Sequence, residues 1–264
     1  MITKTIIKCT ASALAVMLLS AFAEAAVVTK SIEYKSGDKV FEGLLVSPDD
    51  THHKHPMIVM VHNWMGVTDE TKKQATRFAE LGYDVFAADI YGKGVRPQDY
   101  KAAGELATLY KSDRPLFRER LNLALQTALA QPNVNKKKVA VVGYCFGGTG
   151  ALELARSGAP LKATITFHGG LDSPAPADGK NIKGKVLALH GADDPYVPAK
   201  DVAAFENEMI SNKVSYQLIK YPNAVHSFTD KGAGTDNSKG AAYNEAADLQ
   251  SFAEAKKLLA VVLK

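Results

Sequence analysis

Hydrophobic residues in this chain gather in short, nearly continuous runs that are separated by longer amphipathic segments. The runs cover 57–61, 84–88, 138–143, 163–167, 185–189 and 214–221. Strands that are buried on both faces of a parallel sheet have such runs, because neither face meets water. The segments with helical spacing cover 68–81, 99–131, 146–157, 202–210 and 245–263. Pro115 predicts a break within the second of these helical segments.

Two segments of alternating apolar and polar residues, 27–34 and 39–46, precede this pattern. Gly37 and Asp38 lie between them and predict a turn, so we expect an antiparallel hairpin. Strands that alternate with helices after such a hairpin indicate an α/β fold with a mostly parallel central sheet and flanking helices. In sheets of this kind active sites lie at the carboxyl ends of the strands, so the residues just after each strand are the candidates for chemistry.

The polar segment 48–56 contains His52, His53 and His55. Three histidines raise the question of a metal site, but no cysteine or carboxylate at ligand spacing accompanies them. We therefore expect a solvated loop here and predict no metal site.

The N-terminus has the pattern of a secretory signal peptide. Lys4 and Lys8 precede an apolar run of small residues at 11–23, which is too short to cross a bilayer. We expect cleavage after residue 23, or as late as residue 26, and a single domain over 27–264. The protein would then be exported, periplasmic or extracellular, with no stable membrane anchor; an uncleaved N-terminal anchor is the alternative.

The net charge limits the kinds of partner to expect, and the cysteine content leaves one thiol as a candidate for chemistry. The chain has 32 basic and 28 acidic residues. Loss of Lys4 and Lys8 with the signal leaves a net charge near zero, which gives no reason to expect a nucleic-acid partner. Of the two cysteines, Cys9 and Cys145, only Cys145 would remain. A free thiol in an exported protein is either buried and inert or reactive, and its sequence context decides.

Cys145 stands in the sequence Gly-Tyr-Cys-Phe-Gly-Gly, between a predicted strand and a predicted helix. This matches a nucleophile elbow with cysteine in place of serine. The turn strains the backbone of the nucleophile, and side chains two positions on either side would clash, so glycine is required at 143 and 147. The helix N-terminus that follows favours a thiolate and directs N–H groups at a developing oxyanion.

An acidic loop follows the fifth buried strand and contains Asp193 and Asp194. In this position a carboxylate can orient a catalytic histidine. Asp194 stands three residues before Val197, so we assign the orienting role to Asp194 and a turn-stabilising role to Asp193.

His226 follows the sixth buried strand. The order along the chain is Cys145, Asp194, His226, which is the order nucleophile, acid, base of the α/β-hydrolases. A lone histidine in a loop is usually a surface residue, but this conjunction favours a catalytic triad on an α/β-hydrolase fold.

The oxyanion hole of this fold takes one N–H from the residue after the nucleophile and another from the loop after the first buried strand. These are the backbone N–H groups of Phe146 and Trp64. His62 and His168 also stand at strand ends. Each could line the pocket or pack in the core, and we expect packing for both.

The sequence resembles the dienelactone hydrolase family over about residues 30–260. The matching motifs are HNWMGV at 62–67, ADIYG at 88–92, GYCFGG at 143–148, GADDPYVP at 191–198 and HSF at 226–228. The resemblance implies a Cys-His-Asp triad, which falls on Cys145, His226 and Asp194. It also implies a lone α/β-hydrolase domain without a large lid, and no cofactor.

The resemblance also suggests which residues line the substrate pocket: Asn63, Tyr91, Lys93 and Asp230. The best-known members have a glutamate at the position of Asn63 and an arginine, which binds a substrate carboxylate, at the position of Asp230. A second arginine position is Lys93, which keeps the charge. Asp230 would repel a carboxylate, so these departures predict a preference for neutral substrates; Arg96 nearby could reverse it by entering the pocket.

The resulting prediction is an exported hydrolase that cleaves a small-molecule carboxylic ester or lactone through a thioester acyl-enzyme. Two alternatives stay open. One is a non-catalytic binding module that kept the fold, and the other is a peptidase-like hydrolase. The intact triad speaks against the first, and the absence of an additional lid or propeller domain speaks against the second.

Overall fold

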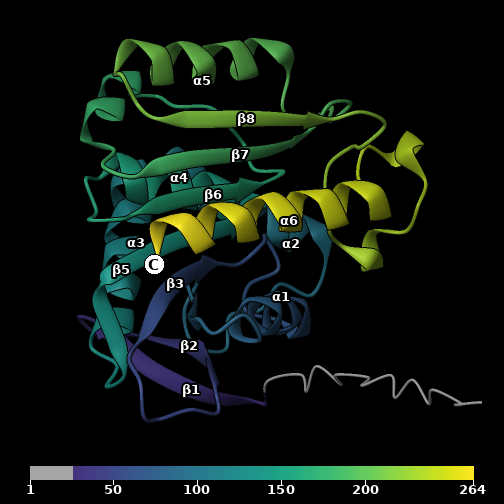
Figure 1. Ribbon diagram of the computed structural model, residues 1–264. Coiled ribbons are helices and arrows are strands. Elements are labelled where there is room, and N and C mark those ends of the chain that lie inside the picture. The colour runs from purple at the N-terminus through teal and green to yellow at the C-terminus, as the bar shows by residue number, and fades with distance from the viewer. Residues whose placement is uncertain (1–25) are drawn as a thin grey trace, which may run out of the picture.

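A computed structural model describes residues 26–264 as an eight-stranded sheet between two layers of helices (Figure 1). The predicted signal peptide, residues 1–23, lies outside the described residues. The strands are β1 Val27–Ser36, β2 Lys39–Pro48, β3 His55–Val61, β4 Asp84–Ala88, β5 Val134–Tyr144, β6 Ala163–Phe167, β7 Lys185–Gly191 and β8 Tyr216–Tyr221.

The strands follow the order β1-β2-β4-β3-β5-β6-β7-β8 across the sheet. β1 and β2 form the predicted antiparallel hairpin, and β2 pairs antiparallel with β4. All further pairs, from β4 to β8, are parallel. The predicted α/β-hydrolase fold with a mostly parallel sheet is therefore confirmed.

Helices cover both faces of the sheet. They are α1 Asp69–Ala79, α2 Tyr100–Ser112, α3 Arg114–Leu129, α4 Phe146–Arg156, α5 Ala199–Ser211 and α6 Glu245–Val262. In the view of Figure 1, α1 and α6 lie on the near face, and α3 and α4 lie behind the sheet. The predicted break at Pro115 is confirmed: α2 ends at Ser112, and the side chain of Asp113 caps α3 by accepting the N–H of Leu116.

Two large apolar cores follow from the alternation of side chains along the central strands. In β3, Val59 and Val61 face the core beneath α3 and α4, whereas Ile58 and Met60 face the core beneath α1 and α6. Successive residues of a strand point to opposite faces. A continuous apolar run such as that of β3 can therefore supply both cores at once.

Three strands begin at residues other than those that the sequence predicts. β5 begins at Val134 rather than 138, and β8 begins at Tyr216. β3 begins at His55, so the prediction of a solvated loop is wrong at that residue. His55 pairs with Val134 in the sheet, is only 9% exposed and has Nδ1 3.3 Å from Oδ1 of Asp84.

A buried network of charges ties α4 to its neighbours. The guanidinium of Arg156, fully buried, donates to the carboxylates of Glu153 and Glu208. Arg114 and Arg118 of α3 also donate to Glu153. Each buried charge has a partner, which offsets the cost of removing it from water. Helix α4, whose N-terminus forms the candidate active site, is thereby fixed to α3 and α5.

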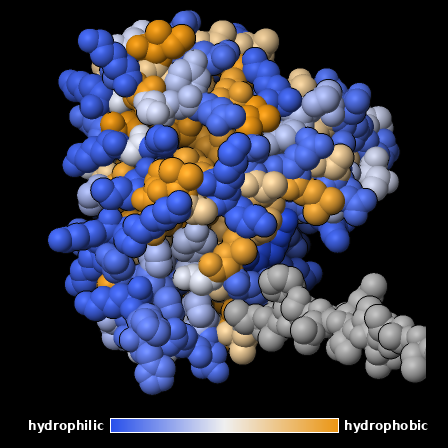
Figure 2. Space-filling model, viewed as in Figure 1, coloured by the Kyte–Doolittle hydropathy of each residue, from blue (hydrophilic) through white to orange (hydrophobic). Residues whose placement is uncertain are grey.

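Within residues 26–264, no helix is long and apolar enough to cross a membrane. Hydrophilic residues dominate the face seen in Figure 2, where apolar side chains form smaller patches between them. The same part of the chain contains no group of three or more His, Cys, Asp or Glu residues arranged to hold a metal ion.

Candidate active site

Cys145 lies at the sharp turn between β5 and α4, with φ 55° and ψ −118°. This left-handed conformation is strained for a residue with a side chain. A Cβ at Gly143 would lie 1.8 Å from the carbonyl oxygen of Gly147, and a Cβ at Gly147 would lie 2.1 Å from that of Val61. Both glycines are therefore required by close backbone contacts, as the sequence predicts.

Three side chains from three strand ends meet in a hydrogen-bonded line. Nε2 of His226 lies 3.0 Å from Sγ of Cys145, and its Nδ1 lies 2.8 Å from Oδ2 of Asp194. The second oxygen of Asp194 accepts the backbone N–H of Tyr196 at 2.8 Å. The carboxylate is fully buried, whereas Asp193 is exposed. The structure thus brings together Cys145, His226 and Asp194.

The electrostatics of this line favour a thiolate beside an imidazolium. Burial opposes ionisation of Cys145, but the charge and hydrogen bond of His226 and the N–H of Phe146 outweigh it, so the thiol pKa lies below its ordinary value. Burial likewise lowers the pKa of His226, yet Cys145 and Asp194 raise it to about 10. A sulfur held in this state can attack a carbonyl carbon.

These pKa directions predict the pH dependence of thiol alkylation. Because the pKa of Cys145 is lowered and that of His226 is raised to about 10, Cys145 should hold more thiolate near neutral pH than an ordinary thiol. The second-order rate constant of iodoacetamide with Cys145 is expected to rise less steeply between about pH 7 and 9 than that of an ordinary thiol, which gains about tenfold per pH unit below its pKa near 8.5. His226→Ala should restore the ordinary rise. A steep rise in the unsubstituted protein would contradict the ion pair.

The loop after β3 lies beside the sulfur and contains Trp64. The backbone carbonyl of Trp64 accepts a hydrogen bond from the hydroxyl of Tyr91 at 3.0 Å, and the ring of Tyr91 packs on His62 and Phe146. Tyr91 is only 1% exposed. It therefore holds the Trp64 loop in place from behind and does not line either cavity at Cys145, where it was predicted.

His62 and His168 are both buried and neutral. Burial lowers the pKa of His62 to about 4, and its Nε2 accepts the N–H of Ile90. Burial and the charge of His226 hold the pKa of His168 well below its ordinary value, and its Nε2 bonds the hydroxyl of Thr229 at 2.9 Å. Neither histidine is hydrogen-bonded to the sulfur, but both line the larger cavity at Cys145 as well as packing in the core.

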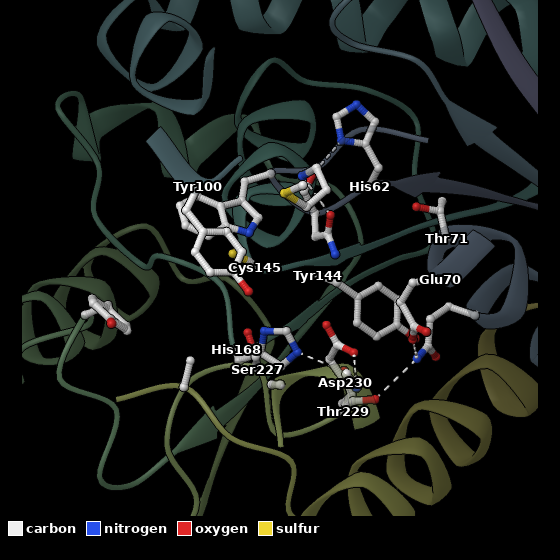
Figure 3. A pocket seen from close by; sticks show the side chains of 18 of the residues that line it. His62, Glu70, Thr71, Tyr100, Tyr144, Cys145, His168, Ser227, Thr229 and Asp230 are labelled. Atoms are coloured by element: carbon white, nitrogen blue, oxygen red, sulfur yellow. Dashed lines mark hydrogen bonds between the residues drawn. The ribbon is translucent and has the colours of Figure 1, made fainter. Parts of the chain in front are cut away.

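Two cavities meet at Cys145. The larger has a volume of about 820 Å³ and extends toward α1 and the loop before α6 (Figure 3). The smaller has a volume of about 340 Å³ and extends along α2, with His226 and Phe146 in its wall. The residues that line both are Trp64, Cys145, Tyr196, Ser227 and Ala241. A bound molecule can therefore extend from the sulfur in two directions.

A sequence model of the dienelactone hydrolase family matches residues 41–263, which is most of the chain. The chain belongs to the dienelactone hydrolase family. It is accordingly a dienelactone hydrolase-like enzyme, a hydrolase of lactones or esters, as the sequence predicts.

Known proteins agree with this assignment. A Synechocystis sp. protein named "Putative carboxymethylenebutenolidase" is 26% identical, over 80% of this chain and 88% of its own. The solved structure called m3DLH superposes with a TM-score of 0.87 at 37% identity and covers 90% of this chain and 100% of its own. A dienelactone hydrolase-like promiscuous phosphotriesterase, P91, from metagenomic libraries reaches 0.85 at 35% identity with the same coverage.

In this dienelactone hydrolase family member, the other predicted pocket residues separate into two groups. Asn63 and Asp230 line the larger cavity. Lys93 does not: its ammonium is exposed and pairs with Glu33, with Glu42 4.0 Å away. These two glutamates face each other across the β1–β2 hairpin, and their joint charge attracts Lys93 away from the site.

Arg96 does not enter the cavities either. Its guanidinium donates to the carbonyls of Val67 and Val95, and lies 3.8 Å from Asp89. Arg96 could reverse the predicted charge preference only if these contacts broke.

Sequence reasoning missed several polar residues of the cavities. Tyr144, Glu70 and Gln74 line the larger cavity, and Lys111 lines the smaller, where its charge contributes to the lowered pKa of Cys145. Glu70 and Gln74 are four residues apart on α1, which places them on one helix face. That spacing and the adjacency of Tyr144 to the nucleophile were the available signals, whereas nothing in the sequence marks Lys111.

Proposed function

We propose that this protein is an exported Cys-His-Asp hydrolase that cleaves a carboxylic ester or lactone through a thioester acyl-enzyme. The observation that carries the proposal is the hydrogen-bonded line from Asp194 through His226 to Cys145. Export rests on the signal-like pattern of residues 1–23. The hydrolase class rests on the family of the chain.

The first half of the reaction forms the acyl-enzyme. The thiolate of Cys145 adds to the substrate carbonyl, and the N–H groups of Phe146 and Trp64 stabilise the oxyanion. The tetrahedral intermediate collapses, the ester C–O bond breaks, and the proton on Nε2 of His226 passes to the leaving oxygen. In a lactone this oxygen stays attached to the acyl group.

The second half releases the acid. Nε2 of His226, now neutral, takes a proton from water while the water oxygen adds to the thioester carbonyl. Collapse expels the thiolate, and His226 holds the proton beside it. Asp194 keeps the proton of His226 on Nδ1 throughout, so that Nε2 stays free to accept.

The proposal predicts which substrates are cleaved fastest. Asp230 lines the larger cavity, and Lys93 is engaged elsewhere. A charged hydrogen bond contributes about 1.5–3 kcal/mol, so its loss together with repulsion should cost more than about tenfold. Neutral aryl esters or lactones are expected to exceed their carboxylate-bearing analogues in kcat/KM by at least that factor.

One panel of neutral and carboxylate-bearing esters and lactones tests both the hydrolase activity and the preference for neutral substrates. Asp230→Arg should narrow the charge gap, whereas Asp193→Asn, a charge change on an exposed side chain outside both cavities, should leave the gap unchanged. Wild-type preference for the carboxylate-bearing analogue would refute the charge argument. No turnover of any panel member with Cys145 reduced would refute the hydrolase and favour the binding module.

A further inference from the structure

The larger cavity contains a buried hydroxyl that has no partner. The side chain of Tyr144 is 94% buried, since its exposed fraction is 6%, and it lines the cavity. Its hydroxyl makes no hydrogen bond to any described residue. Burial raises its pKa, so the phenol stays protonated and remains a donor. A buried donor without an acceptor is costly and indicates that a further group belongs there.

Carboxylates accompany this hydroxyl. Figure 3 shows the phenol of Tyr144 directed toward Glu70, with Asp230 on the same side of the cavity. One oxygen of Glu70 accepts from Gln74 at 2.9 Å, and the other lies 3.9 Å from the ammonium of Lys73. Since a carboxylate offers about four lone-pair directions, Glu70 keeps capacity for another donor.

This arrangement selects among chemical groups. A carboxylate could accept from Tyr144, but Glu70 and Asp230 would repel it. An ammonium could donate to Glu70, but it has no lone pair for the proton of Tyr144. A hydroxyl both accepts and donates, so it satisfies Tyr144 and Glu70 together.

The leaving group belongs to the other cavity. His226 must protonate the leaving oxygen, and of the two cavities His226 lines the smaller one. The larger cavity is left for the acyl part of the substrate. Its greater volume, about 820 Å³ against about 340 Å³, suits the longer portion of a molecule.

We propose that the larger cavity is an acyl subsite that binds a substrate hydroxyl between the Tyr144 hydroxyl and the Glu70 carboxylate. The preferred substrates are then esters or lactones of hydroxylated acids. This inference rests on the proposed hydrolase activity and specifies its substrate class.

The test compares p-nitrophenyl esters of medium-chain ω-hydroxy acids with those of unsubstituted acids of the same lengths. At the chain length that reaches Tyr144, the hydroxylated ester is expected to have a kcat/KM at least about tenfold higher, the effect of one or two net hydrogen bonds. Tyr144→Phe and Glu70→Gln should each reduce this preference several-fold. The matched ketone-bearing ester should gain less, because a carbonyl cannot donate to Glu70.

Tyr221→Phe is the matched control. Tyr221 is also a buried tyrosine whose hydroxyl has no partner among the described residues, but it lies outside both cavities. It should leave the hydroxyl preference unchanged. Tyr144→Phe should not lower the thermal midpoint, because the lost hydroxyl makes no hydrogen bond in the free protein.

The outcomes separate the two proposals. Equal hydrolysis of both esters at every length would overturn the subsite while the hydrolase stands. An equal loss on both esters in Tyr144→Phe, together with a lower thermal midpoint, would assign Tyr144 a structural role and overturn it as well. Hydrolysis of neither ester by the wild type would refute the proposed function, and the subsite with it.

Discussion

Cys145→Ala is expected to lower kcat for a neutral aryl ester by about 10⁶-fold, the scale seen when a triad nucleophile is removed. The sulfur is the atom to which His226 Nε2 is hydrogen-bonded at 3.0 Å, and it lies where both cavities meet. Without it, no thioester forms, and only binding and the N–H groups of Phe146 and Trp64 would remain. Steady-state hydrolysis measures the loss.

Alkylation provides an independent check of the same residue. Iodoacetamide should abolish hydrolysis in proportion to the modification of Cys145. Peptide mass analysis measures this modification and distinguishes Cys145 from Cys9. Labelling confined to Cys9 should leave the activity intact. Full modification of Cys145 with unchanged hydrolysis would show that another group is the nucleophile.

Asp194→Asn is expected to lower kcat by about 10⁴-fold, with KM little changed. The carboxylate accepts from Nδ1 of His226 at 2.8 Å and from the N–H of Tyr196 at 2.8 Å. An amide at this position can turn its NH₂ toward Nδ1, which favours the tautomer with the proton on Nε2. That nitrogen could then no longer accept a proton from the thiol or from water.

Asp193→Asn is the matched control, because the side chain of Asp193 is exposed. Its backbone N–H donates to the carbonyl of Ala224, and the substitution leaves that bond in place. Its effect on kcat should be small. The pH profile of alkylation adds a second readout: Asp194→Asn should shift the onset of Cys145 labelling to higher pH, whereas Asp193→Asn should not. The opposite ranking of the two variants would transfer the orienting role to Asp193.

Much of the fold was predictable because burial leaves a direct mark on the sequence. The runs at 57–61 and 84–88 coincide with β3 and β4 within two residues, since strands covered on both faces must be apolar throughout. Strand ends were less predictable. His55 is polar yet buried, because Asp84 on the adjacent strand supplies a partner that sequence separation conceals.

In the candidate site too, features fixed by nearby residues could be predicted, whereas those fixed by distant residues could not. The elbow at Cys145 was recognisable because its glycines are required by contacts within a few residues and with the adjacent strand. The position of Lys93 was not, because its ion pair with Glu33 depends on how the β1–β2 hairpin packs beside the loop after β4.

By itself, the sequence determined the α/β class and the sharp glycine-flanked turn at Cys145, since these follow from burial patterns and short-range sterics. Only the tertiary structure decided that residues 81 positions apart meet at 3.0 Å, that Tyr91 supports a loop, and that the hydroxyl of Tyr144 stays unpaired in a cavity that Glu70 also lines. The physical reason is that hydrophobicity specifies which residues are buried. Which of them meet depends on the order of strands and on how the helices pack over them.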